Sequence, residues 1–310
     1  MSDLEQYVLP TILYIPITMP YTHLITPEQL QALQARRAPL KVFDVSFDLA
    51  DPAKAEAMFA EARIAGAILA HLERDLSAGL PLSANAQAVN GGRHPLPTRE
   101  ALAAWLTRMG LTNEMQAVVY DRNGVNYCGR LWWMLKWAGH DAVAVLDGGL
   151  QAWQAAGGAT ESGAAPQPTP ANPPFALHAP LREFMDTQKV LRHLDQPGQT
   201  LIDARGAPRY RGDAEPLDPV AGHIPGALNR PFNENFAADG RYKAPGQIKA
   251  EFDALLAGRD PASVVHYCGS GVSALANVLA MEIAGYPPVP LYAGSWSEWS
   301  RTPGLPCAQG

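Results

Sequence analysis

Cysteine is scarce in this chain, with only 3 residues of this type among 310, at positions 128, 268 and 307, and no CxxC pair. An odd and sparse set excludes a disulfide framework and lacks the ligand spacing of a zinc site. We therefore expect a protein without bound metal, located in a reducing cytoplasm.

Charge of one sign and long apolar runs are scarce as well. Charged residues make up 17% of the chain, the formal net charge is -6, and Lys and Arg never form a run of five or more. The electrostatic signature of a nucleic-acid binder is therefore missing. No stretch approaches the roughly 20 uninterrupted apolar residues of a membrane span. We expect neither nucleic acid nor a membrane as partner.

The apolar segment from Tyr7 to Met19 has the wrong flanks for a secretion signal. Acidic residues precede it, the first basic residue is Arg36, and Pro10 and Pro16 interrupt it. We interpret it as a folded or draped N-terminal arm, whose contacts the sequence does not reveal.

Strand-like and helix-like segments alternate along the chain. Residues 41–45, 116–120 and 142–146 have strand character, and 127–138 has helical periodicity. Alternation of this kind predicts an α/β fold with a mainly parallel sheet and helices on both faces. The length favours two such domains.

The second half of the chain repeats landmarks of the first half in the same order. Ile64–Ala67 corresponds to Ile224–Ala227, and the pair Tyr120-Asp121 corresponds to Tyr267-Cys268. The offsets drift, as an old duplication with changes in loop length would make them.

A segment rich in proline separates the two halves. Six prolines lie between residues 157 and 180, and such a sequence can continue neither a helix nor a central strand. We predict a first domain at residues 1–157, an extended linker at 158–178, and a second domain at 179–310.

Cys268 lies where a predicted strand, 263–267, meets a predicted helix, 273–284, which Gly285 ends. The free amides of a first helical turn and the helix dipole favour an anion at such a junction. A thiol there can have its pKa lowered from about 8.5 into the range of about 3.5 to 7.5, so we expect Cys268 to be a thiolate.

The residues that follow Cys268 suit an anion cradle. Gly269 and Gly271 permit a tight turn with inward amides, and Ser270 and Ser273 add hydroxyl donors around Val272. The alternative, a small thiol filling the core, fits poorly because glycine and serine pack weakly. That alternative suits Cys128, which lies in the predicted helix, whereas Cys307 is expected to be a bystander.

The string from Cys268 to Ala274 resembles the active-site loop of the tandem rhodaneses, especially the mercaptopyruvate sulfurtransferases. Gly222–Ala227 and Leu291–Trp299 resemble two further strings of that family, and the resemblance spans about residues 38–302. It implies two tandem rhodanese-like domains, with sulfur carried as a persulfide on Cys268 and no cofactor. It also implies a first domain that is not catalytic, since Asp121 stands at the place of the cysteine.

The resemblance extends to substrate-binding positions, with two departures. Arg209 aligns with the substrate-anchoring arginine of the family, although a surface ion pair is an alternative role. Leu217 follows Glu215-Pro216, where mercaptopyruvate enzymes have a second arginine. Arg63 stands where we place a family histidine that works with the loop serine, and it either restores positive charge to the pocket or faces water.

The donor and the acceptor stay open at this point. Gly269 and Ser270 lack the Arg and Lys of thiosulfate-type loops, so 3-mercaptopyruvate is slightly favoured over thiosulfate as the small anionic donor. The acceptor is expected to be a thiol such as thioredoxin or glutathione, or cyanide. His223 and His266 are the nearest histidines in sequence for handling protons, although structural roles suit both better.

Two other functions compete with sulfur transfer to small acceptors. A cysteine-based phosphatase needs an arginine six positions after the cysteine, and Ala274 occupies that place. A persulfide carrier or interaction module without small-molecule turnover needs the same cysteine and stays open.

Overall fold

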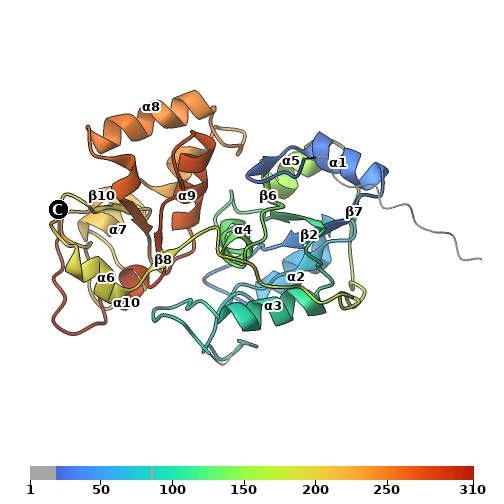
Figure 1. The fold of residues 1–310 in the computed structure, drawn as a ribbon, viewed down its shortest axis with the longest axis horizontal. Coiled ribbons are helices and arrows are strands. Elements are labelled where there is room, and N and C mark those ends of the chain that lie inside the picture. Colours follow the sequence, from blue (N-terminus) through green and yellow to red (C-terminus); the bar gives the residue numbers. More distant parts are fainter. Residues whose placement is uncertain (1–18, 85–86) are drawn as a thin grey trace, which may run out of the picture.

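The computed structural model describes residues 19–84 and 87–310, which form two lobes of α/β architecture (Figure 1). The first lobe contains a five-stranded parallel sheet in the order β1-β6-β5-β2-β4. Its strands are β1 (Leu24–Ile25), β2 (Leu40–Asp44), β4 (Ile68–Leu69), β5 (Gln116–Tyr120) and β6 (Val143–Leu146).

The second lobe contains another five-stranded parallel sheet, in the order β8-β12-β11-β9-β10. Its strands are β8 (Phe184–Met185), β9 (Thr200–Asp203), β10 (Leu228–Asn229), β11 (Val264–Tyr267) and β12 (Leu291–Tyr292). Each strand occupies the place of its counterpart in the first sheet, so the predicted α/β class and the internal duplication are both confirmed.

Helices connect the strands, as parallel sheets require. In the first lobe they are α1 (Pro27–Ala35), α2 (Lys54–Glu61), α3 (Arg99–Arg108), α4 (Cys128–Trp137) and α5 (Gly149–Ala155). In the second lobe they are α6 (Thr187–Arg192), α7 (Ala207–Arg211), α8 (Pro245–Leu256), α9 (Ala274–Ile283) and α10 (Ser295–Trp299), with short 3-10 turns at Phe232–Asn235 and Pro261–Ser263. The helices predicted over 127–138 and 273–284 are thus α4 and α9.

Matching hydrogen bonds at equivalent positions support the duplication. The Tyr120 hydroxyl accepts from the Ile64 amide at 3.0 Å, and the Tyr267 hydroxyl accepts from the Ile224 amide at 3.2 Å. Each tyrosine is the last residue of a buried central strand. The bond therefore anchors the same loop to the same strand in both lobes.

The proline-rich segment between the lobes is not a free tether. Thr160–Glu161 (β7) pairs antiparallel with Arg63–Ile64 (β3), the Ala171 amide donates to the Thr107 carbonyl at 2.7 Å, and Phe175 is buried. Proline excludes this segment from a central strand, but its other amides and apolar side chains still find partners on the first lobe. The domain limits stay a prediction, and the predicted N-terminal arm lies almost wholly outside the described residues.

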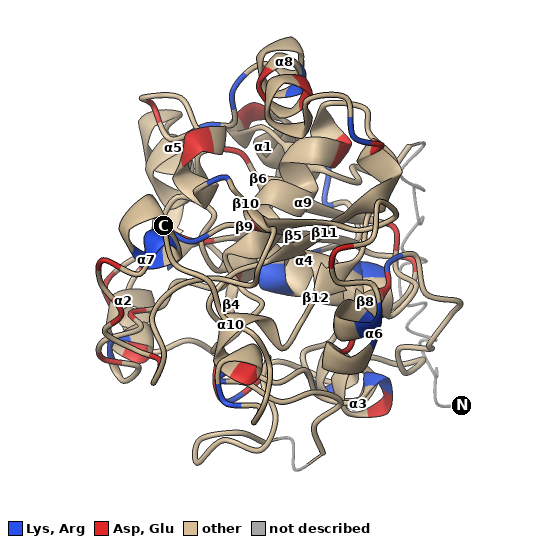
Figure 2. Ribbon diagram, turned by 90° about the vertical axis from the view of Figure 1, so that its left-hand side faces the viewer, with Lys and Arg blue, Asp and Glu red and all other residues tan. Residues whose placement is uncertain are grey.

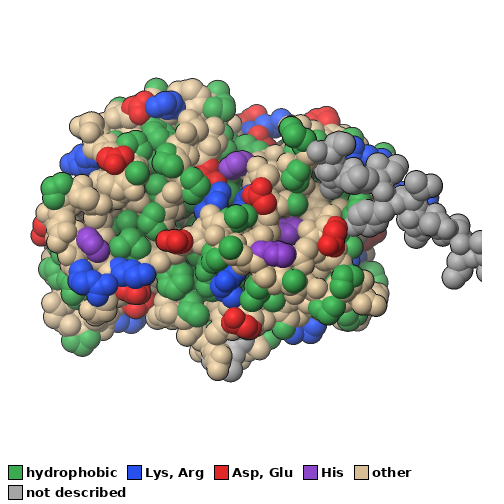
Figure 3. Space-filling view, viewed as in Figure 1, with side chains coloured by type: hydrophobic (Ala, Val, Ile, Leu, Met, Phe, Trp, Pro, Cys, Tyr) green, Lys and Arg blue, Asp and Glu red, His purple; other side chains and the backbone are tan. Residues whose placement is uncertain are grey.

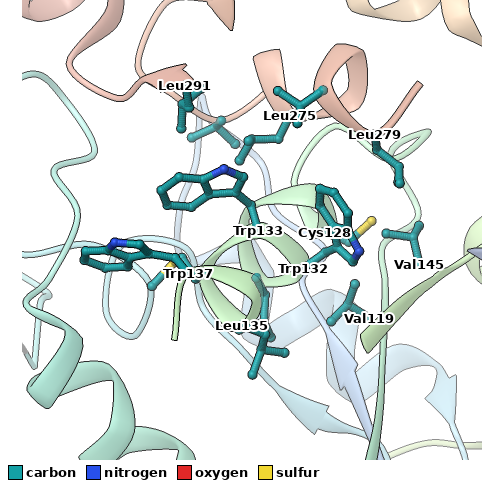
Figure 4. Close-up of a cluster of buried hydrophobic side chains, with 14 of the residues drawn as sticks. Val119, Cys128, Trp132, Trp133, Leu135, Trp137, Val145, Leu275, Leu279 and Leu291 are labelled. Atoms are coloured by element: carbon teal, nitrogen blue, oxygen red, sulfur yellow. The ribbon is translucent and has the colours of Figure 1, made fainter. Parts of the chain in front are cut away.

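The two lobes meet through α4 and α9. All ten residues of α4 are buried, and its tryptophans Trp132 and Trp133 point toward Leu275 and Leu279 of α9 (Figure 4). Gly129 permits this approach, because a Cβ at that position would lie 3.2 Å from the Cβ of Leu275. Close packing of this kind leaves little freedom for the lobes to move independently.

A buried ion pair closes the junction between the lobes. The Arg182 Nε donates to Glu282 Oε1 at 2.6 Å, and His23 Nε2 lies 3.0 Å from Glu282 Oε2. The Arg182 guanidinium also lies over the Trp132 ring, 5.7 Å from its centroid. One carboxylate thus joins the start of the first lobe, the segment entering the second lobe, and α9.

The outer surface shown in Figure 3 carries acidic and basic side chains interspersed with apolar ones. In the part of the chain that the structure describes, we find no helix with the length and apolar character to span a bilayer.

Replacing Glu282 with Ala should lower the free energy of unfolding by about 3–5 kcal/mol, because Arg182 would stay buried without a counter-charge. Urea denaturation followed by circular dichroism measures the change. The exposed pair between Arg211 and Asp213 supplies the control, since Asp213→Ala should change stability by less than about 1 kcal/mol. An effect of Glu282→Ala as small as that of the control would contradict this assignment.

Candidate active site

Cys268 follows β11 directly and precedes α9, as the sequence pattern predicts. The residue is 1% exposed, yet it lines a cavity of about 260 Å³ that lies between the two lobes. The lining includes Leu49, Leu72 and Tyr127 from the first lobe and Arg205, Arg209 and Phe232 from the second. The thiol is therefore shielded from bulk water but faces a space large enough for a small molecule.

Hydrogen bonds to sulfur lower the pKa of Cys268. Burial alone raises this pKa, but the Ser273 hydroxyl and the amides of Ser270, Ala274 and Val272 outweigh the effect of burial. The Val272 amide lies 3.3 Å from Sγ. These donors stabilise the thiolate, which is the nucleophilic form of cysteine.

Steric contacts explain why the loop has glycine at positions 269 and 271. Gly271 has a φ of +71°, and a Cβ there would lie 2.3 Å from the Ala293 carbonyl oxygen. A Cβ at Gly269 would lie 2.8 Å from Nη2 of Arg93, which reaches over the loop from the first lobe. Side chains at either position would displace the loop or its neighbours.

The first lobe has the same cradle, occupied by a carboxylate. Asp121 accepts from the amides of Asn123, Val125, Tyr127 and Cys128 at 2.9 to 3.0 Å. The first three amides stand two, four and six positions after the anion, the same spacing as the three amides that bond the Cys268 sulfur. Asp121 therefore fills its own anion site and leaves no nucleophile there.

Arg130 of α4 holds the loop of Cys268 from the first lobe. Its guanidinium is fully buried and donates to the carbonyls of Gly271 at 3.0 Å, His94 at 2.9 Å and Leu76 at 3.3 Å. Figure 2 shows the Lys and Arg positions of α4 at the centre of the molecule. Burial lowers the pKa of Arg130 to about 9, and the negative charge of Cys268 opposes that decrease. The thiolate is the anion that this cation faces.

A histidine contacts the loop serine, but from an unexpected position. His94 Nδ1 and Ser270 Oγ share a hydrogen bond of 2.8 Å, and Glu73 lies 3.9 Å from His94 Nε2. Burial lowers the pKa of His94, and the charges of Arg130 and Arg93 lower it further against the opposing effect of Glu73. His94 is therefore neutral near pH 7 and able to exchange a proton with Ser270.

The structure does not bring Arg63 to the cavity, which corrects both roles considered for it. Arg63 is 2% exposed, so it does not face water, and it donates to the carbonyls of Gly163 at 2.8 Å and Phe59 at 3.3 Å. Its Nη2 also lies 3.6 Å from Oε2 of Glu161 in the neighbouring strand β7. Arg63 fastens the interdomain segment to the first lobe.

Arg209 lines the cavity, as its alignment predicts, and it is also held by an ion pair. Its Nη2 lies 2.7 Å from Glu215 Oε1 and 3.5 Å from Asp218 Oδ2. Arg205 forms salt bridges with Asp203 and with Glu215, the carboxylate that also pairs with Arg209. The carboxylates orient Arg209 without removing it from the lining of the cavity.

The remaining thiols and histidines have structural surroundings. Burial raises the pKa of Cys128 well above its ordinary value, and Cys307 is exposed at the tail. Burial lowers the pKa of His266 to about 3, and its Nε2 lies 3.1 Å from the Met281 sulfur. His223 is stacked on a tyrosine ring. None of these four side chains is part of the cavity lining.

Comparisons with known proteins agree with this geometry. The rhodanese-like domain matches this chain twice, at residues 26–156 and 186–302. A Pseudomonas aeruginosa protein named "Probable 3-mercaptopyruvate sulfurtransferase" is 43% identical over 296 residues, 94% of this chain and 100% of that one. The thiosulfate sulfurtransferase of Bos taurus is 33% identical, over 66% of this chain and 69% of its own. The structure of 3-mercaptopyruvate sulfurtransferase from Leishmania major superposes with a TM-score of 0.77 at 28% identity, over 92% of this chain and 76% of that one.

The fold and the loop define a two-domain protein with one thiolate cradle and one cradle closed by a carboxylate. This chain belongs to the rhodanese-like family and is a sulfurtransferase. Its relatives over most of its length have names that specify sulfur transfer from either 3-mercaptopyruvate or thiosulfate.

Replacing Asp121 with Ala should lower the free energy of unfolding by about 2–4 kcal/mol, because four amides would lose their acceptor. Asp121→Asn keeps one carbonyl oxygen and should cost less. Urea denaturation measures both changes. If Asp121→Ala is as stable as the parent protein, the carboxylate does not hold this loop.

Proposed function

We propose that this sulfurtransferase takes sulfur from 3-mercaptopyruvate onto Cys268 and passes it to a thiol acceptor, such as thioredoxin or glutathione, or to cyanide. The observation that carries the proposal is the Cys268 sulfur, which receives inward amides and faces a cavity of about 260 Å³. A cytoplasmic location is part of the proposal, since the three cysteines are free thiols.

The first half-reaction forms the persulfide. The Cys268 thiolate attacks the donor sulfur, an S–S bond forms, the C–S bond breaks, and its electron pair leaves with the three-carbon fragment as the enolate of pyruvate. The proton of the donor thiol finally resides on the methyl carbon of pyruvate. Ser270 and His94, 2.8 Å apart beside the loop, are placed to carry that proton.

The second half-reaction regenerates the thiolate. A thiolate acceptor attacks the outer sulfur of the persulfide, the S–S bond breaks, and its electron pair returns to Cys268. The acceptor leaves as a persulfide, or as thiocyanate when the acceptor is cyanide. The amides that stabilise the thiolate before the first step favour it again as the leaving group of the second.

Thiosulfate is the second candidate donor. The loop after the cysteine offers Gly269 and Ser270, which add no charge to hold a dianion. The cationic side chains that line the cavity are Arg93, Arg205 and Arg209, and all three are already paired with carboxylates. This surrounding favours a monoanionic carboxylate over thiosulfate.

The deciding experiment compares kcat/KM for 3-mercaptopyruvate and thiosulfate on one preparation, with Cys268→Ser as the control. We expect a higher value for 3-mercaptopyruvate and no turnover with either donor in the variant, because serine cannot hold a second sulfur. Release of only one equivalent of pyruvate per chain, with acceptor in excess, would instead indicate a persulfide carrier. A higher kcat/KM for thiosulfate would overturn the donor assignment.

A further inference from the structure

Two guanidiniums from different lobes converge above the residue that follows the catalytic cysteine. The position of a Cβ on Gly269 would lie 2.8 Å from Nη2 of Arg93 and 3.5 Å from Nη1 of Arg209. Arg209 belongs to α7 of the second lobe, whereas Arg93 comes from the loop that precedes α3 in the first. Both side chains line the cavity of Cys268.

The loop carrying Arg93 is fixed against α10. The Arg93 amide donates to Ser297 Oγ at 3.0 Å, and the Gly91 amide donates to Glu298 Oε2 at 3.0 Å. A Cβ on Gly92 would lie 2.7 Å from both the Gly294 carbonyl oxygen and Ser297 Oγ, so the backbone here touches the second lobe directly. The position of Arg93 over the catalytic loop is therefore set by main-chain contacts.

Asp218 orients the arginines from below. Its carboxylate, fully buried, pairs with Arg93 Nη1 and lies 3.5 Å from Arg209 Nη2. Arg301 reaches the same carboxylate from the solvent side at 2.9 Å. Among the described residues, Arg93 Nε has no hydrogen-bond partner, although it is buried. Arg93 thus retains unused donors beside the thiolate, where an unpaired buried donor is otherwise costly.

We propose that Arg93 and Arg209 together bind the carboxylate of the sulfur donor. Arg93 comes from the first lobe, which has no nucleophile, and replaces the second arginine that mercaptopyruvate enzymes have at the position of Leu217. The identity of the donor rests on the proposed function, but the affinity for a carboxylate does not. Two arginines on one carboxylate give directional, charge-assisted hydrogen bonds, which a single point charge cannot.

The geometry suits an anionic donor. The two guanidiniums lie over Gly269, the residue next to Cys268, and line the same cavity as its thiol, so a carboxylate that they bind lies in the cavity that the thiol faces. The arrangement therefore selects donors by charge.

The test uses alkylation of Cys268 by iodoacetate, a carboxylate, and by iodoacetamide, its neutral counterpart. With Arg93→Gln, we expect the ratio of the iodoacetate rate to the iodoacetamide rate to fall about 10-fold, with the iodoacetamide rate unchanged. With 3-mercaptopyruvate, the same variant should raise KM by about 10-fold or more and leave kcat within a factor of about 3. Arg93→Lys keeps the charge and should give an intermediate loss.

Arg301→Gln is the matched control, because Arg301 shares Asp218 with Arg93 but does not line the cavity. It should leave the alkylation ratio unchanged. If Arg93→Gln slows both reagents equally, or leaves the ratio as it was, Arg93 is a structural ion pair and the proposal is wrong. If the parent protein prefers iodoacetate through Arg93 yet turns over no 3-mercaptopyruvate, then Arg93 and Arg209 do bind a carboxylate but the proposed function is wrong.

Discussion

The structure depends on one constraint: main-chain amides after the central strand of each lobe converge on a single buried position that must hold an anion. In the second lobe that anion is the Cys268 sulfur, and in the first it is the Asp121 carboxylate. Unpaired buried amides are costly, so each lobe needs an occupant for its cradle. The amides that lower the pKa of Cys268 are therefore also part of what holds its loop together, and the two lobes differ in whether a thiol or a carboxylate occupies the cradle.

The lobe without a nucleophile still completes the site. Arg130 crosses the interface between α4 and α9 to hold the Gly271 carbonyl and to face the thiolate, and His94 contacts Ser270. The α4 side chains pack against α9 and thereby fix Arg130 and His94 relative to the loop of Cys268, because a close-packed interface permits little relative movement. The two copies thus differ in what they bring to the cavity: the second lobe supplies the thiol, and the first supplies the Arg130 guanidinium and the His94 imidazole.

The sequence predicted what is local and repeated. The two parallel sheets, the position of Cys268 between strand and helix, and the need for glycine at 269 and 271 all follow from short strings and their periodicity. It did not predict groups that reach across the interface. His94 and Arg93 lie in a loop without periodicity, and nothing in their neighbours along the chain indicates that they meet a loop 176 positions away. Alignment with the family placed Arg63 at the substrate pocket, but in this fold its side chain points into the first lobe.

The most direct test of the account is the pH dependence of Cys268 alkylation by iodoacetamide, measured in a Cys307→Ser background because Cys307 is exposed. Burial raises the pKa of Cys128 and keeps that thiol unreactive. Since hydrogen bonds lower the pKa of Cys268, the midpoint of its reaction rate with pH should lie below the ordinary thiol value of about 8.5. A midpoint at or above about 8.5 would mean that the amides do not stabilise a thiolate, and the account would be wrong.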